Sequence, residues 1–261
     1  MGDWETLFVI TAFGTIVLIP FVYNDIAYMF SYGDVTLFLL LGVSTVLLIA
    51  ALLDFESLKK GKIAVVEPVL ALEVPVTVIL AFAVINESLQ LLDIFLITTL
   101  ILGLILVSLK TRRLTKKAWL ERGVVLAAIG AFFMGTSNFL VGFASRVTNP
   151  LFANWFINIF LAVVSLFYIM SHKRTGVLFQ DFKGNSRLII GVSIFDNLAW
   201  IAFAFAATLI PIAIAVAISE SYIALAALLG LVVSKEKLMK HQHAGLAIAL
   251  TSAVALAAIY A

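Results

Sequence analysis

The 261-residue sequence contains no cysteine, only three histidines and few charged residues, and each shortage excludes a class of protein. Without cysteine the chain can form no disulfide, no thiolate nucleophile and no cysteine-ligated metal site. The histidines do not show the spacing that places two metal ligands on one helix face, and no zinc-protease, serine-hydrolase or phosphate-loop motif occurs. The sequence therefore predicts neither an enzyme nor a protein that holds a metal or an organic cofactor.

Long apolar runs make up most of the chain. Hydrophobic residues make up 63% of the chain and charged residues 12%. A bilayer core of roughly 30 Å requires about 20 apolar residues per helix. Because the runs are continuous rather than alternating, they predict helices and not a barrel. We predict an all-α polytopic membrane protein with nine transmembrane helices in the lipid bilayer, at residues 6–25, 35–53, 63–85, 91–109, 122–146, 150–171, 188–209, 211–233 and 243–260.

Lysine and arginine gather in every second gap between these helices. Sixteen of the 17 basic residues lie in the loops, and only Arg146 falls on the opposite side. Short loops rich in lysine and arginine mark the cytoplasmic face. The sequence therefore predicts a cytoplasmic N-terminus and an external C-terminus in the plasma (inner) membrane, with no nucleic-acid partner. The basic loops are residues 54–62, 110–122, 172–187 and 234–242.

The chain also contains an internal repeat. Gly42 and Gly191 begin the same Gly-Val-Ser tripeptide, and Glu87 and Glu236 end equivalent segments, with 149 residues between the members of each pair. This shift matches four helices of the first half with four of the second and leaves 122–146 unmatched. Units with an odd number of helices become antiparallel in the membrane when they are duplicated. We predict two inverted repeats of four and five helices joined by a basic cytoplasmic linker: residues 1–109, 122–261 and, for the linker, 110–121.

Each repeat closes with the same pattern, a helix followed by a glutamate, a short loop and a last helix that contains glycine. It occupies residues 71–103 and 221–245, with Glu87 and Glu236 as the glutamates, which we expect to be solvated or to serve helix packing. The pattern resembles the EamA family of the drug/metabolite transporter (DMT) superfamily, whose ten helices form two five-helix units. The resemblance implies export of metabolites or drugs. It also implies that the first helix of the first repeat is missing here, and that both termini are cytoplasmic, which the charges contradict for the C-terminus.

Carboxylates inside the predicted helices are the candidate pathway residues. A carboxylate at the bilayer centre costs about 2.5–3.5 kcal/mol on insertion scales, so it is expected to face a cavity or a partner. Glu73, Asp196 and Glu220 are such residues, and Glu73 and Glu220 lie at similar depths on repeat-related helices. For the asparagines and Trp200, packing between helices is the alternative role. The remaining candidates are polar or aromatic residues of the predicted helices: Asn197, Trp200, Asn138, Asn158 and Tyr222.

Inverted repeats, membrane carboxylates and the lack of a catalytic motif together favour a secondary transporter. We predict an exporter or a proton-coupled antiporter that moves small cationic, zwitterionic or neutral metabolites or drugs by alternating access. A strongly anionic substrate is disfavoured because no lysine or arginine lies at mid-membrane depth. Protons are candidate coupling ions, and a homodimer is left open. The alternatives are a non-transporting membrane assembly partner and a truncated, inactive transporter fragment.

Overall fold

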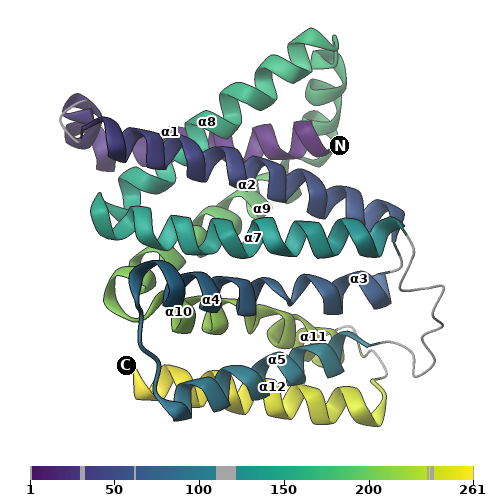
Figure 1. The fold of residues 1–261 in the computed structure, drawn as a ribbon. Helices are drawn as coiled ribbons and strands as arrows, with labels where there is room; N and C mark the ends of the chain where they lie inside the picture. Colours follow the sequence, from purple (N-terminus) through teal and green to yellow (C-terminus); the bar gives the residue numbers. More distant parts are fainter. Residues whose placement is uncertain are drawn as a thin grey trace. The chain divides into compact units, whose positions relative to one another are not determined.

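Helices account for nearly all of the chain that the structure describes (Figure 1). The computed structural model describes residues 2–29, 33–61, 63–109, 122–233, 235 and 238–260, except for the side chains of 63–65. The whole predicted basic linker, residues 110–121, lies outside the described residues, together with Lys62, Glu236 and Lys237. The helices are α1 (Asp3–Ala27), α2 (Asp34–Lys60), α3 (Ile63–Leu70), α4 (Glu73–Ile85), α5 (Leu91–Ser108), α7 (Arg122–Val147), α8 (Pro150–Ser171), α9 (Thr175–Leu209), α10 (Ile212–Glu220), α11 (Tyr222–Val232) and α12 (Lys240–Ile259).

Nine stretches of these described helices are long and apolar enough to cross a membrane. Seven of them are single helices. The other two, Val66–Ile85 and Ile212–Val232, are each divided between two helices. The prediction of an all-α polytopic membrane protein with nine spans is confirmed.

The two divided spans break at equivalent positions of the internal repeat. Ala71 and Leu72 separate α3 from α4, and Ser221 separates α10 from α11. Leu72 has φ −67° and ψ −9°, and Ser221 has φ −62° and ψ −10°. These two residues are also 149 positions apart, which is the shift that relates the repeats. The interruption is therefore a shared feature of the two halves, and discontinuous spans in corresponding positions are the pattern that marks binding sites in transporters with inverted repeats.

Different residues produce the two breaks. Pro75 has no N–H, and its ring crowds the carbonyl four residues earlier, that of Ala71, which favours a kink or a break in the helix here. In the second span the hydroxyl of Ser221 donates a 2.6 Å hydrogen bond to the carbonyl of Ile218. Such bonds from a serine to its own helix bend the backbone. A proline and a serine thus give the same local geometry.

Two helices extend through residues that the charge pattern predicts to be loops. α2 continues to Lys60 instead of ending at residue 53, and α9 begins at Thr175 instead of residue 188. Charged residues end the apolar run without ending the helix, because lysine, arginine and glutamate are good helix formers. Within its added segment α9 bends at Asn185, whose backbone is not helical (φ −132°, ψ 27°).

The chain divides into two compact units that alternate along the sequence. Unit 1 comprises Met1–Leu48 and Leu140–Thr208, and unit 2 comprises Ile49–Phe139 and Leu209–Ala261. The boundaries fall within α2 and α7 and just before the last residue of α9. Each unit therefore draws on both halves of the sequence, and the division into repeats at residues 110–121 stays a prediction.

In unit 1, α1 lies along α8 (Figure 1). The ring of Trp4, in the first turn of α1, stacks on Tyr168 near the end of α8, with 4.2 Å between the ring centroids. Farther along the same pair, Gly14 of α1 lies against the amide group of Asn158 of α8. The start of α1 meets the end of α8, so the two helices are antiparallel.

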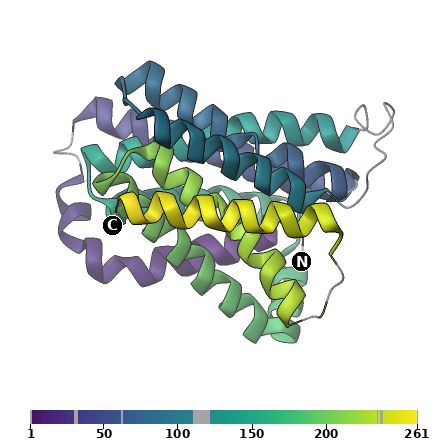
Figure 2. The ribbon, with the colours of Figure 1, turned by 90° about the horizontal axis from the view of Figure 1, so that it is seen from below.

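In unit 2, α5 and α12 form a second antiparallel pair (Figure 1, Figure 2). Hydrogen bonds join the pair at both ends, from the Tyr260 hydroxyl to Asp93 (2.8 Å) and from the Gln242 amide to the Val107 carbonyl (2.9 Å). Between them Gly103 allows backbone contact, because a Cβ there would lie 2.7 Å from a backbone nitrogen of α12. Helices α5 and α12 are thus joined along their length within unit 2.

Candidate functional site

Two glutamates meet in unit 2 at the breaks of the two divided spans. Glu73 is the first residue of α4 and Glu220 is the last residue of α10. The two side chains are buried, with 8% exposure each, and their carboxyl groups hydrogen-bond to each other. Two carboxyl groups can share a hydrogen bond only when one of them holds a proton, because an ionised carboxylate has no donor. The pair is therefore a candidate site for a shared proton.

Helix α7 lies against this pair through a small residue. A Cβ at Gly135 would lie 2.5 Å from the carbonyl oxygen of Glu73, so only glycine allows this approach. The Thr77 hydroxyl donates a 2.8 Å hydrogen bond to the Gly135 carbonyl and joins α4 to α7. Three residues further along α7, the Asn138 amide reaches Oε2 of Glu73 at 3.4 Å, a long hydrogen bond. Asn138, a predicted site residue, is thus placed beside Glu73.

A third carboxyl group, that of Asp54 in α2, belongs to the same cluster. Asp54 is close enough to Glu73 and Glu220 to interact with both electrostatically. Its Oδ1 atom faces Gly130 of α7, where a Cβ would lie 2.4 Å away. Oδ1 of Asp54 and Oε2 of Glu220 are both buried without a hydrogen-bond partner among the described residues. The cluster therefore has bonding capacity that the described protein groups leave unused.

Sequence reasoning missed Asp54 because it ended the helix at residue 53 and counted Asp54 in a loop. The helix continues for six residues beyond Asp54, which keeps this carboxyl group within α2. The signal in the sequence is the segment that follows, which contains good helix formers. Its ends, Glu56 and Lys60, form an i, i+4 ion pair that supports a helix.

Tyr222 begins α11, directly after the break at Ser221. Its side chain is 58% exposed, and its hydroxyl group interacts electrostatically with Glu220, Glu73, Glu67 and Asp54. The structure thus brings together four of the eight predicted site residues, all in unit 2: Glu73, Glu220, Asn138 and Tyr222.

Two further predicted residues, Asn158 and Asn197, form an amide cluster in unit 1. The Asn158 amide donates to the Asn197 side-chain oxygen at 2.9 Å. Asn197 in turn donates to the carbonyls of Ile10 (3.1 Å) and Ser193 (2.9 Å). Gly14 makes room for this arrangement, since a Cβ there would lie 1.9 Å from the Asn197 oxygen. Both Asn197 donors and its acceptor are in use, which is the arrangement expected of a group that holds helices together.

Asp196 and Trp200 occupy the same helix, α9, one turn apart. Asp196 is partly exposed, and within the described part of the chain its carboxyl group makes no hydrogen bond. The Trp200 ring meets Phe203 edge-on, with 6.0 Å between centroids. These two residues belong to unit 1, and their predicted role in a transport pathway stays a prediction.

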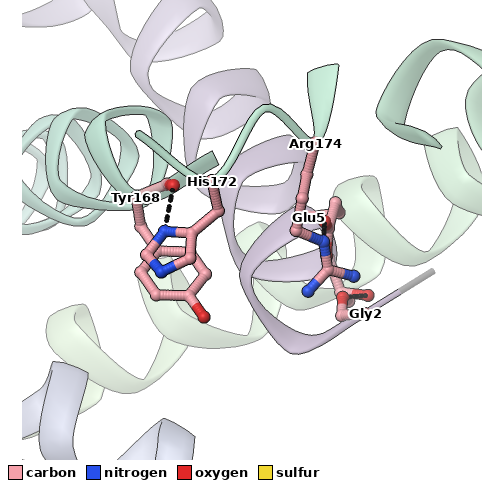
Figure 3. Close-up of polar contacts among 6 residues, drawn as sticks. Gly2, Glu5, Tyr168, His172 and Arg174 are labelled. Atoms are coloured by element: carbon pink, nitrogen blue, oxygen red, sulfur yellow. Dashed lines mark hydrogen bonds and ion pairs between the residues drawn. The ribbon is translucent and has the colours of Figure 1, made fainter. Parts of the chain in front are cut away.

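A buried glutamate that the sequence placed before the first helix also lies in unit 1. Glu5 has no exposed side-chain surface, and Oε1 lies 2.7 Å from Nε of Arg174 in the turn between α8 and α9 (Figure 3). The contact is electrostatic, since neither Glu5 oxygen is in hydrogen-bond geometry with a described residue. Beside it the His172 ring stacks on Tyr168 with 4.0 Å between centroids. Arg174, predicted as a solvated loop charge, instead ties the start of α1 to this turn.

With the carboxyl pair located at two matched helix breaks, the whole chain can be set beside known proteins. The model of the EamA-like transporter family matches residues 1–109 and 121–258. No curated protein matches the sequence. One solved structure, described only as "Crystal structure of protein", aligns with 99% of this chain and 88% of its own, with a TM-score of 0.72 and 14% identity. At that identity the likeness shows a shared fold.

Proposed function

Because this chain belongs to the EamA-like transporter family, we propose that it is a secondary carrier that exchanges protons for small cationic, zwitterionic or neutral metabolites or drugs. The proposal includes alternating access as the mode of transport and export as its direction. It also includes the orientation given by the basic loops, with the N-terminus in the cytoplasm and the C-terminus outside the plasma (inner) membrane.

The observation that carries the proposal is the hydrogen bond between the Glu73 and Glu220 carboxyl groups. When the shared proton leaves, two negative charges are left side by side in a buried place, which is unfavourable. A cationic group of a substrate can remove that repulsion by taking the place of the proton. Proton and cation therefore compete for one site, and competition of this kind is the basis of exchange. A neutral or zwitterionic substrate would use the same carboxyl groups as hydrogen-bond acceptors.

Asp54 has the role of a third acidic group in this proposal. Its unsatisfied Oδ1 can bind either a proton or a donor group of the substrate. Tyr222 and Asn138 supply a hydroxyl and an amide next to the pair, which can orient an amine or amide by hydrogen bonds. In unit 1, Asp196 and Trp200 remain proposed pathway residues, whereas the saturated amide cluster of Asn158 and Asn197 is proposed to pack helices.

The test measures proton movement in liposomes that contain the purified protein and a pH-sensitive dye. The vesicles are challenged in turn with amino acids, polyamines and lipophilic amines. We expect at least one of these classes to drive protons across the membrane. Glu73→Gln and Glu220→Gln should each abolish that signal, and Asp54→Asn should reduce it. The matched control is Glu56→Gln, because Glu56 lies in the same helix as Asp54 but pairs with Lys60.

Two results would count against the carrier. If Glu73→Gln and Glu220→Gln both kept full proton exchange, the carboxyl pair would have no part in coupling. If no compound moved protons, an untargeted comparison of metabolites in cells with and without the protein would show whether anything is exported. An unchanged metabolite profile would favour a non-transporting membrane partner.

A further inference from the structure

A side chain from outside the helix caps the N-terminus of α10. The Glu87 carboxylate, in the loop between α4 and α5, accepts hydrogen bonds from the backbone N–H groups of Ile212 (3.0 Å) and Ala213 (3.1 Å). The first N–H groups of a helix have no partner within the helix. Pro211, at the N-cap position of α10, provides no side-chain cap. Glu87 meets this need, and its negative charge also suits the positive end of the helix dipole.

The end of α4 directs Glu87 toward α10. Asn86 has left-handed backbone angles (φ 52°, ψ 36°), which asparagine tolerates better than most residues. This conformation turns the chain back, and the N–H of Glu87 donates to the Ala81 carbonyl at 3.1 Å. The glutamate is thus held by its own backbone while its carboxylate reaches across to the neighbouring helix.

Helices α4 and α10 are therefore joined at both ends. At one end Glu87, two residues beyond the last residue of α4, binds the start of α10. At the other end Glu73, the first residue of α4, bonds to Glu220, the last residue of α10. The two helices also lie in contact along their length (Figure 1). With nine residues, α10 is only about 14 Å long, so a change at its capped end reaches Glu220 through two to three turns of helix.

From these contacts we infer that Glu87 is a positioning residue, which holds α10 in the register that places Glu220 against Glu73. The inference rests on the proposed function for its significance, because the pair matters only if it carries protons. Its geometry can be tested independently of transport. Glu87 itself does not touch the proton or the substrate.

The experiment measures the distance between spin labels on the two helices. Since the sequence has no cysteine, two introduced cysteines are the only labelling sites. Ile79→Cys on α4 and Ser219→Cys on α10 lie at exposed positions, and residue 219 is next to Glu220. With Glu87 intact we expect one narrow distance distribution. Glu87→Gln and Glu87→Ala should replace it with a broad one, because an amide cannot accept from both N–H groups in the same way and an alanine accepts from neither.

Two variants keep the result interpretable. Glu87→Asp retains the charge on a side chain one methylene shorter, and it should give an intermediate width even if the other variants fold poorly. Asp93→Asn is the matched control: Asp93 also caps a helix of unit 2, accepting from the Gln90 N–H at 2.9 Å, but this helix is α5. The control should keep the narrow distribution.

The outcomes separate this inference from the proposed function. A narrow distribution in Glu87→Gln, or equal broadening in Asp93→Asn, overturns the positioning role and leaves the carrier proposal standing. If Glu87→Gln broadens the distribution while Glu73→Gln and Glu220→Gln keep full proton exchange, the positioning role stands and the proposed function fails. If the positioning role and the proposed function both hold, Glu87→Gln should also alter the pH profile of exchange. A purely structural role for Glu87 would leave that profile unchanged.

Discussion

The polar clusters of the two units differ in how far their bonding capacity is used. In unit 1 the side-chain oxygen of Asn197 accepts a hydrogen bond from Asn158, and its amide nitrogen donates to two backbone carbonyls, so both Asn197 donors are engaged. In unit 2 Asp54 and Glu220 each keep a buried oxygen without a hydrogen-bond partner among the described residues. A saturated cluster can only hold helices together. A cluster with unused acceptors can bind a proton or a cation, so unused bonding capacity, and not polarity alone, marks a candidate transport site.

The largest expected effect comes from removing the acidic group of unit 2. Glu220→Gln should reduce proton-coupled exchange to background, because the amide cannot give up or take up a proton at neutral pH. It should leave the melting temperature of the purified protein near that of the unmodified protein, since the side chains have nearly the same size. A large fall in melting temperature together with the loss of exchange would make Glu220 a structural residue instead.

Filling the space at Gly135, beside the Glu73–Glu220 pair, should lower the free energy of unfolding. Gly135→Ala forces a Cβ to within 2.5 Å of the Glu73 carbonyl, so α7 has to move away from α4. Overpacking of this kind costs about 1–3 kcal/mol, which a thermal or denaturant unfolding curve would detect. Gly42→Ala is the control, because a Cβ at Gly42 meets nothing within 4 Å. Equal melting temperatures for the two variants would show that the helices tolerate separation here.

A smaller effect is expected in the amide cluster of unit 1. Asn197→Ala removes three hydrogen bonds between helices and within α9. Interhelical bonds of this type average about 0.6 kcal/mol and reach about 1.7 kcal/mol in membrane proteins, so the melting temperature should fall modestly. The pH profile of exchange should stay unchanged. A shifted profile would mean that the cluster takes part in coupling, contrary to the distinction drawn between the units.

The smallest effect concerns Tyr260 at the end of the α5–α12 pair. Burial, together with the hydrogen bond to Asp93, raises the pKa of Tyr260 to about 12 from its usual value of 10. Because the folded protein holds this proton more tightly, its stabilising contribution is complete below pH 10 and is lost between about pH 10 and 12. An ultraviolet titration should show a late ionisation step near pH 12 that is lost in Tyr260→Phe. If the late step persisted in that variant, it would belong to another tyrosine.

The sequence was sufficient to predict the spans and to single out Glu73 and Glu220 as candidates, but it does not predict that the two side chains meet. Hydrophobic length defined nine spans, and the cost of placing a carboxylate in a membrane singled out Glu73 and Glu220. The repeat shift aligns Glu73 with Tyr222, so the two glutamates are not equivalent positions. The structure explains the offset: Glu73 follows one helix break and Glu220 precedes the other, and antiparallel helices bring them together.

Other parts of the site depend on contacts that no local pattern contains. The apolar run ends at residue 53, so the pattern predicts a loop at Asp54, whereas the helix continues to Lys60. The Glu87 cap joins residues 125 positions apart, and the Asn197 bond to Ile10 joins residues 187 apart. Such contacts depend on how the helices pack. No spacing of residues in a single sequence reveals them. Glu87, which the sequence predicts to be solvated or to serve helix packing, accepts hydrogen bonds from the first N–H groups of α10.

The length of α9 has a consequence for the surrounding lipid. Its 35 residues would extend roughly 52 Å as a straight helix, well beyond a hydrocarbon core of about 30 Å. The bend at Asn185 separates ten residues at its start, and among these Phe179 leaves 73% of its side chain uncovered. An exposed apolar ring on a segment that extends beyond the core is expected at the boundary between headgroups and acyl chains. Changes in bilayer thickness would thus be accommodated at the bend at Asn185, so that membranes of different thickness could hold the same protein without distorting its interior.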